Sequence, residues 1–346
     1  MEVGIFGNAE VGKSTLFHAL TGTEEVACQR KHAGVCVIKV PDDRVDRLAE
    51  IFRPKKATYV SVAFHDIDAG EPDLLSTQAV AAIRDVDVLV LMLRGFSDNY
   101  HPVPPGGLDP VKEFHSITDA LILSDYLIAQ KRIERMTKEA KRDTEWVALH
   151  KAISGLEKGI PIREIGLSSE EERALCGFRF LSRIPALLVL NVDEAAIGEE
   201  VFPELSRTAE AARVPLMRMC ARVEEEIARL SKEEQAEFIK EMRTGRSARD
   251  RMIRGAFDAM SHISFFTVGD DEVRAWNVRK GSIAVAASGK IHSDMEKGFI
   301  RAEVISCEDF LRCGSMSKAR AEGKLRLEGK EYIVKDGDIM HVRFNV

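Results

Sequence analysis

The stretch Gly7-Asn-Ala-Glu-Val-Gly12-Lys13-Ser14-Thr15 decides the fold of this chain. It matches the pattern G-x-x-x-x-G-K-[ST] and lies between an apolar run at residues 3–6 and a helical pattern that begins at Lys13. In a strand, loop and helix of this kind, backbone N–H groups and the helix N-terminus face phosphate oxygens. We therefore predict that a nucleotide phosphate is bound by Asn8, Ala9, Glu10, Val11, Gly12, Lys13, Ser14 and Thr15.

Two side chains of this loop have predicted chemical roles. Lys13 can reach the β- and γ-phosphates and is the predicted catalytic residue, because its ammonium group can stabilise charge on the transferring phosphoryl group. The hydroxyl group of Ser14 is a predicted Mg²⁺ ligand.

Strand and helix patterns alternate through the first hundred residues. Residues 86–93 are almost continuously apolar, as is typical of a central strand covered on both faces. The alternation predicts an α/β fold with a doubly wound sheet. Its other strands are expected at residues 3–6, 36–40, 59–65, 186–190 and 215–220, with a short helix at 44–52.

A different periodicity interrupts this pattern after a stretch rich in proline and glycine at residues 101–110. Apolar residues then recur at alternating spacings of four and three along two segments, which predicts an antiparallel helical hairpin. Ser168 and Glu171 are spaced as a capping box at the start of a third helix. The seam residues are Ile122, Tyr126, Ala129, Ile133, Met136 and Ala140, followed by Trp146, Leu149, Ile153 and Leu156.

The last part of the chain carries short β patterns at residues 265–268, 283–286, 331–334 and 340–344, separated by glycine and aspartate turns. They predict a small α+β domain. The expected organisation is a nucleotide-binding domain at 1–105 and 183–261, a helical insertion at 106–182 and a C-terminal domain at 262–346.

A second candidate site element follows the predicted strand at 186–190. Asn191-Val192-Asp193-Glu194 stands where small GTPases carry N-K-x-D, but valine replaces lysine and glutamate replaces aspartate. Asn191, Val192 and Glu194, with Cys220 and Ala221 after the next strand, are the predicted base-binding residues. Taken alone, N-x-x-E also fits an ordinary polar loop after a strand.

Composition excludes several classes of protein. The formal net charge of -6 argues against a protein that binds nucleic acid through a uniformly basic surface, although it is compatible with a local basic patch. The six cysteines include no C-x-x-C pair, which is atypical of a zinc site or a disulfide framework. The chain has no apolar run of about 18 residues and residues 3–6 are too short for a signal-peptide core, so we expect a cytoplasmic protein without a membrane span.

The motifs together resemble the YchF/Obg-like ATPase family over nearly the whole chain. The matching segments are Glu10-Val-Gly-Lys-Ser-Thr-Leu16, Pro41-Asp-Asp-Arg44-Val-Asp46, Asn191-Val-Asp-Glu194, Glu272-Val-Arg-Ala-Trp276, Gly289-Lys-Ile-His-Ser-Asp294, Glu296-Lys-Gly-Phe-Ile-Arg301, Glu308-Asp-Phe310 and residues 332–338. The resemblance implies a P-loop domain with an inserted coiled-coil arm and a TGS-like, ubiquitin-like C-terminal domain. It also implies slow Mg²⁺-dependent hydrolysis of ATP, preferred over GTP, and association with ribosomes.

Two segments depart from that family. Residues 28–34 lack the threonine that the family's first switch uses at the Mg²⁺ site, and Asp66-Ile-Asp-Ala-Gly70 is one residue longer than the family's D-I-A-G. By its place in that second switch, the resemblance still implies that Asp66 belongs to the metal site, in the second coordination sphere of Mg²⁺. Two alternatives therefore stay open beside an ATPase. One is a nucleotide-binding scaffold without efficient turnover, and the other is a GTPase.

Basic residues gather at the expected tip of the hairpin. They fit either an arm that contacts RNA phosphates or a solvated coiled-coil face, and the family resemblance favours RNA. These residues are Lys131, Arg132, Arg135, Lys138, Lys141 and Arg142. His65 beside Asp66 is predicted to be structural, because neighbouring residues of a strand point to opposite faces.

Overall fold

The computed structural model describes residues 1–21, 34–68, 75–98, 100, 102–241 and 247–345. The chain divides into two compact units. One comprises residues 1–38 and 63–256, and the other comprises residues 39–62 and 257–346.

A six-stranded sheet with the order β2-β4-β1-β5-β6-β7 forms the centre of the first unit. Strand β1 pairs in parallel with β4 and β5, and β6 pairs in parallel with β5 and β7. Six consecutive residues of β5 are buried, as the apolar pattern predicted. The strands are β1 (Glu2–Phe6), β2 (Val35–Lys39), β4 (Ser61–Asp66), β5 (Val88–Gly95), β6 (Ala186–Val192) and β7 (Leu216–Met219).

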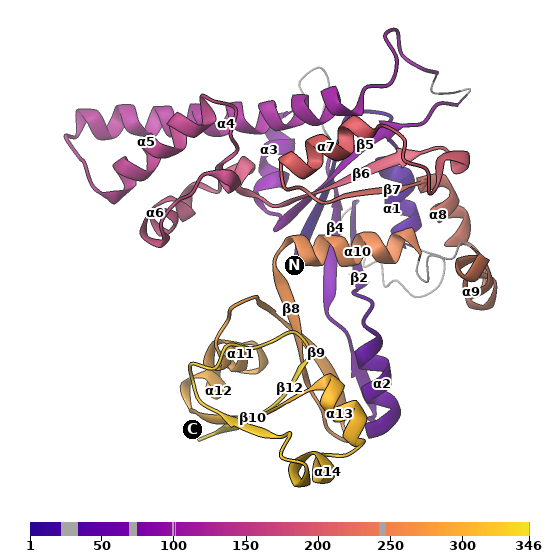
Figure 1. Ribbon diagram of the computed structural model, residues 1–346. Coiled ribbons are helices and arrows are strands. Elements are labelled where there is room, and N and C mark those ends of the chain that lie inside the picture. The colour runs from indigo at the N-terminus through magenta and orange to yellow at the C-terminus, as the bar shows by residue number, and fades with distance from the viewer. Residues whose placement is uncertain (22–33, 69–74, 99, 101, 242–246, 346) are drawn as a thin grey trace. The chain divides into compact units, whose positions relative to one another are not determined.

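Helices cover both faces of this sheet (Figure 1). Leu188 and Leu190 of β6 belong to a core shared with α3, α4 and α7. The intervening Leu187 faces α10, where a Cβ on Gly255 would lie 3.3 Å from it. The predicted doubly wound α/β fold is therefore confirmed. Helices of this unit outside the insertion are α1 (Lys13–Thr21), α3 (Thr77–Arg84), α7 (Pro203–Ala211), α8 (Ala221–Ile227), α9 (Lys232–Glu241) and α10 (Ala248–Ala259), with the short 3₁₀ turn η4 (Glu194–Ala196).

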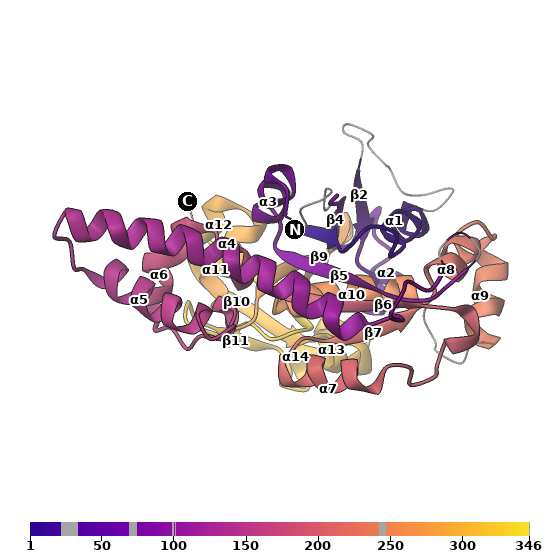
Figure 2. The same cartoon turned by 90° about the horizontal axis from the view of Figure 1, so that it is seen from above.

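The insertion is a helical hairpin whose two long helices lie side by side in both views (Figures 1 and 2). Helix α4 (Pro110–Lys138) begins with Pro110 in its first turn and the Asp109 carboxylate as N-cap. It is followed by α5 (Thr144–Leu156) and α6 (Ser169–Leu175), and the predicted capping box of Ser168 and Glu171 is present at the start of α6. Ala140 of the predicted seam lies beyond the end of α4 and is exposed. The 3₁₀ turns η1 (Ile162–Glu164), η2 (Cys176–Phe178) and η3 (Leu181–Arg183) complete this region.

A buried carboxylate joins the hairpin to the segment that returns to the sheet. Asp125 of α4 is fully buried and accepts hydrogen bonds from the backbone N–H groups of Leu181 and Ser182, at 2.8 and 2.7 Å. Burial raises the pKa of Asp125 to about 6, although these hydrogen bonds oppose the shift. The contacts hold η3, which leads into β6, against the middle of α4.

The second unit contains its own six-stranded sheet, in the order β11-β10-β12-β8-β9-β3. Strand β8 pairs antiparallel with β9 and parallel with β12, and β10 pairs antiparallel with both β11 and β12. The strands from the C-terminal part are β8 (His262–Thr267), β9 (Glu272–Arg279), β10 (Phe299–Ser306), β11 (Arg326–Glu328) and β12 (Asp338–Phe344). The helices are α11 (Ala284–Ile291), α12 (Ser293–Lys297), α13 (Cys307–Cys313) and α14 (Met316–Ala321).

Residues 39–62 join this second unit although they lie far away in the sequence. Helix α2 (Asp43–Phe52) stacks the ring of Phe52 on Phe310, with centroids 5.2 Å apart. Strand β3 (Lys56–Thr58) pairs in parallel with β9. The sequence placed this segment in the nucleotide-binding domain, and the predicted three-domain boundaries remain an expectation.

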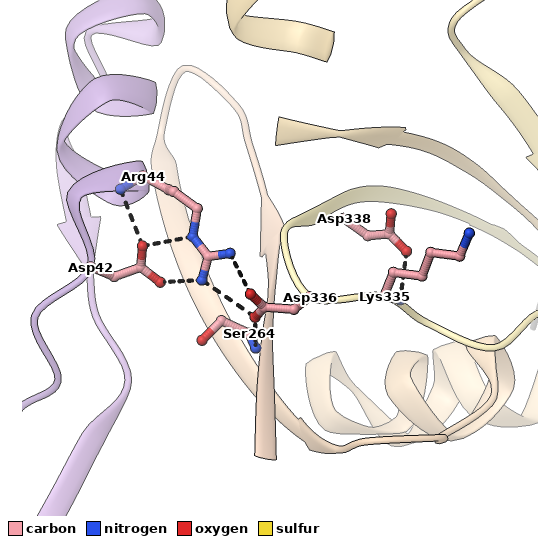
Figure 3. A network of polar contacts seen from close by, with 6 residues as sticks. All are labelled: Asp42, Arg44, Ser264, Lys335, Asp336 and Asp338. Atoms are coloured by element: carbon pink, nitrogen blue, oxygen red, sulfur yellow. Dashed lines mark hydrogen bonds and ion pairs between the residues drawn. The ribbon is translucent and has the colours of Figure 1, made fainter. Parts of the chain in front are cut away.

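A charged network fastens α2 to the C-terminal part of the unit (Figure 3). The guanidinium group of Arg44 donates to both carboxylate oxygens of Asp42, at 2.8 and 2.7 Å, and to Asp336 at 2.8 Å. Asp336 also accepts from the backbone N–H of Ser264, at 2.9 Å. Arg44 therefore links the start of α2 to β8 and to the loop before β12.

Two of the predicted β segments are wrong. Residues 283–286 do not form a strand, because α11 starts at Ala284 and buries Ala284 and Ala287 three residues apart, a helical spacing. Residues 331–334 form only an isolated bridge between Ile333 and Ile283. The strand expected at 59–65 is present as β4, which begins two residues later, at Ser61, and pairs with β1.

Candidate functional site

The phosphate-binding loop lies at the carboxyl end of β1, between that strand and α1. Its backbone turns through left-handed conformations at Glu10, with φ of 60°, and at Gly12, with φ of 95°. Glycine is required at two points, because a Cβ on Gly7 would lie 2.4 Å from the carbonyl oxygen of Met92 and one on Gly12 would lie 2.5 Å from Asn191. The two glycines therefore let the loop pack closely against β5 and the side chain of Asn191.

The side chain of Lys13 folds over this loop. Its Nζ donates hydrogen bonds to the carbonyl oxygens of Gly7 and Asn8, at 2.9 and 2.7 Å. Burial lowers the pKa of Lys13, and the charges of Asp66, Asp68 and Glu113 oppose that shift. The ammonium group thus lies among the backbone groups that would surround a phosphate.

Asn191, one of the predicted base-binding residues, is held by two hydrogen bonds within the protein. Its side chain is only 5% exposed, its Nδ2 donates to the carbonyl oxygen of Val11 at 3.0 Å, and its Oδ1 accepts from the N–H of Ala221 at 2.9 Å. The amide therefore connects the phosphate-binding loop to the start of α8. Val192 is likewise buried, and it belongs to the core of the sheet as well as to the wall of the cleft described next.

A cleft of about 1210 Å³ opens beside these elements. Because the carboxyl ends of neighbouring parallel strands meet at one edge of a sheet, segments after β1, β5, β6 and β7 all contribute to it. Of the predicted residues, the lining contains Glu10, Gly12, Lys13, Ser14, Thr15, Asn191, Val192, Glu194, Cys220 and Ala221. Asn8, Ala9, Val11 and Asp66 are outside this lining.

Sequence reasoning missed several residues of the cleft. Phe96 follows β5, and its half-buried ring packs under the guanidinium group of Arg94 at 5.3 Å. Arg222 and Arg229 line the cleft from α8 and the residues after it. The position of Phe96 directly after the central strand was the available signal, since ligand-binding residues of open α/β sheets follow strand ends.

The residues predicted to hold Mg²⁺ have suitable chemistry. Ser14 is exposed at the N-terminus of α1, and Asp66 ends β4 close enough to Lys13 for their charges to interact. Burial raises the pKa of Asp66, and the positive charge of Lys13 opposes this. A hydroxyl group and a carboxylate are oxygen ligands of the kind that Mg²⁺ prefers, so these side chains fit the ion.

His65 has a structural partner, as the sequence predicted. Its Nε2 forms a short contact with a carboxylate oxygen of Glu2, on the neighbouring strand. The predictions about residues 28–33 and about Gly70 concern positions outside the described residues.

Within the described residues, no helix is both long enough and apolar enough to cross a bilayer.

Comparison with known proteins identifies the family. Residues 262–345 match the family model YchF-GTPase_C, described as a protein of unknown function (DUF933). The ribosome-binding ATPase YchF of Bacillus subtilis is 35% identical over 100% of both chains, and the protein of that name from Haemophilus influenzae is 37% identical over 99% of both. The structure of the Schizosaccharomyces pombe YchF GTPase has a TM-score of 0.89 and 28% identity, and the match covers 99% of this chain and 97% of that one. Because such relatives match along their whole length, the chain belongs to the YchF family.

Proposed function

We propose that this protein binds ATP with Mg²⁺ in the cleft around residues 7–15, hydrolyses it, and associates with the ribosome in the cytoplasm. The observation that carries the proposal is the phosphate-binding loop, which has Lys13 over its carbonyl groups and α1 starting at its end. Relatives named ribosome-binding ATPase that match over the full length support the partner and the reaction.

The loop would act mainly by positioning and charge. Backbone N–H groups and the N-terminus of α1 would bind phosphate oxygens, while the Lys13 ammonium group would leave the carbonyls of Gly7 and Asn8 for the β- and γ-phosphates. Bound Mg²⁺ would neutralise phosphate charge, and Ser14 and Asp66 are the residues we propose to hold it.

The base would lie near the loops after β5, β6 and β7. We propose that Phe96 offers a flat apolar face to the base and that the segment from Val192 to Glu194 lies at its edge. Glu194 replaces the aspartate that guanine-specific loops use, which favours adenine. The Schizosaccharomyces pombe relative is titled a GTPase, so GTP is the second candidate substrate.

Single-turnover hydrolysis of ATP and of GTP, measured with Mg²⁺ on the same preparation, tests the assignment. We expect faster turnover and tighter binding with ATP. Tighter binding of GTP would transfer the assignment to a GTPase. Binding of ATP without turnover would instead support the scaffold that the altered sequences at 28–34 and 66–70 suggest.

The tip of the helical arm is the proposed contact with ribosomal RNA. Arg132 is held by Glu145 at 2.6 Å and Lys141 by Asp143 at 3.1 Å. The other basic residues at the tip are exposed, and they are Lys131, Arg135, Lys138 and Arg142. Side chains of this kind suit contacts with phosphates.

Charge reversal at the tip should weaken ribosome association. In the double variant Lys138→Glu/Arg142→Glu, we expect co-sedimentation with ribosomes to fall by about tenfold or more at moderate salt, because phosphate contacts are replaced by repulsion. The matched control is Lys112→Glu/Lys158→Glu, which reverses two exposed charges away from the tip. Lys112 lies in the first turn of α4, and Lys158 follows the end of α5. If both double variants co-sediment like the unmodified protein, the arm tip does not bind the ribosome.

A further inference from the structure

The phosphate-binding loop and the helical arm share a direct polar contact between residues far apart in the sequence. Nδ2 of Asn8 donates a hydrogen bond to Oε1 of Glu113, at 3.0 Å. The second carboxylate oxygen, Oε2, accepts from the backbone N–H of Arg94 at 2.9 Å. Glu113 thus joins the loop after β1, the end of β5 and the first turn of α4.

This contact restrains one end of the loop. Asn191 holds Val11 near the other end, through the hydrogen bond from its side chain to the Val11 carbonyl. Asn8 is also the residue whose carbonyl oxygen accepts from Lys13, at 2.7 Å. The backbone of Asn8 therefore contacts the predicted catalytic lysine, and its side chain contacts the arm.

Glu113 also acts on Lys13 through charge. Its carboxylate is one of three whose charge raises the pKa of Lys13 against the effect of burial. Burial in turn raises the pKa of Glu113, and the hydrogen bonds from Arg94 and Asn8 oppose that shift. Removal of the carboxylate would therefore change both the geometry of the loop and the electrostatic environment of the lysine.

The root of α4 is well placed to transmit such a change. Phe114, Ile117 and Leu121 in its first turns are buried against the sheet. Helix α4 runs without a break over 29 residues, from Pro110 at its root to Lys138 at its far end, along the length of the arm (Figure 2). A continuous helix couples a displacement at its root to its far end more directly than a flexible linker could.

We propose that Glu113 is a positioning residue that fixes the Asn8 end of the phosphate-binding loop to the root of the helical arm, so that nucleotide binding and the state of α4 are coupled. The coupling to nucleotide rests on the proposed function. In this proposal, the first turn of α4 belongs both to the nucleotide site and to the helical arm.

Steady-state kinetics of ATP hydrolysis provide the first test, with Asn8→Ala, Glu113→Ala and the double variant. We expect kcat/KM to fall about tenfold in each single variant. The double variant should have a kcat/KM no lower than that of the less active single variant, because both changes remove the same contact. Glu113→Gln should recover part of the loss, since its amide oxygen still accepts one of the two N–H groups. Asp119→Asn, an exposed carboxylate further along α4, is the matched control and should behave like the unmodified protein.

Hydrogen exchange on the full chain provides a test that needs no turnover. Without nucleotide, Glu113→Ala should speed exchange of the amides at residues 7–12, while Asp119→Asn leaves them unchanged. Addition of Mg·ATP should slow exchange at residues 110–117 in the unmodified protein, and this response should be lost in Glu113→Ala even though the variant still binds ATP.

The two readouts separate this proposal from the proposed function. If the unmodified protein hydrolyses ATP and Glu113→Ala matches Asp119→Asn in both kinetics and exchange, the coupling is refuted and the function stands. If the unmodified protein neither binds nor hydrolyses ATP, the proposed function and the nucleotide coupling fail. The exchange at residues 7–12 then still decides whether Glu113 restrains the loop.

Discussion

Replacing Lys13 with alanine is expected to slow single-turnover hydrolysis of ATP by about 10²–10³-fold. The reason is that Nζ of Lys13 lies over the loop carbonyls and would meet the charge that develops on the transferring phosphoryl group. Mixing excess protein with labelled ATP and Mg²⁺ measures the chemical step, and a separate titration with ADP measures binding. The hydrolysis rate and the affinity for ADP are both compared with those of Lys112→Ala, which replaces an exposed lysine in the same unit.

The outcome distinguishes catalysis from folding and from binding. We expect Lys13→Ala to retain the unfolding transition of the unmodified protein, because its ammonium group is only half-buried and the carboxylates of Asp66 and Glu113, with which its charge interacts, are half-buried as well. Turnover within about threefold of the unmodified rate, in a variant that binds ADP normally, would show that Lys13 has no catalytic role.

Replacing Arg44 with alanine is expected to destabilise the second unit by about 3 kcal/mol. Asp42 is only 8% exposed and would lose its bidentate partner, while Asp336 would lose its ion pair across the fold. Arg44→Lys should restore only part of the stability, because an ammonium group cannot reproduce the paired hydrogen bonds of a guanidinium group. Of the two ion pairs that Arg44→Ala removes, the one with Asp336 contributes less to stability, since the Asp336 side chain is 41% exposed and solvent screens the pair.

Fluorescence can follow this unit separately. The two tryptophans are Trp146 in the arm and Trp276 in β9, so the variants are compared in a Trp146→Phe background during urea unfolding. Arg47→Ala removes an exposed arginine from the same helix and should change the free energy of unfolding by less than about 0.5 kcal/mol. If Arg44→Ala unfolds at the same urea concentration as Arg47→Ala, the network does not stabilise the unit.

Local patterns predicted the strand, loop and helix around residues 7–15 correctly because the whole motif is contained in one continuous segment. The direction of the Asn191 side chain could not be predicted in the same way. It depends on the carbonyl of Val11 and the N–H of Ala221, which the fold brings together from distant parts of the chain. Glu113 was missed for the same reason, since nothing in the sequence around it indicates that Asn8 is its neighbour.

Local patterns also could not predict that residues 39–62 join the second unit. The amphipathic pattern predicted α2, but a pattern specifies an apolar face and not the surface that covers it. Phe310, Ser264 and Asp336, which complete its surroundings, are more than 200 residues away. At residues 283–286, a short apolar run fitted a strand or a helix, and alanine at the buried positions decided for the helix.

The second unit is built from two segments that lie far apart in the sequence, and this has a consequence for synthesis of the chain. Residues 39–62 leave the ribosome about 200 residues before residue 257, the start of the segment with which they fold. At 5–20 residues per second, the interval is on the order of 10–40 s. Throughout that time α2, which buries Val45 and Leu48 in the finished protein, lacks β9 and α13, against which it packs. In the nascent chain, the apolar residues of this segment therefore stay without these partners until the last quarter of the chain has been translated.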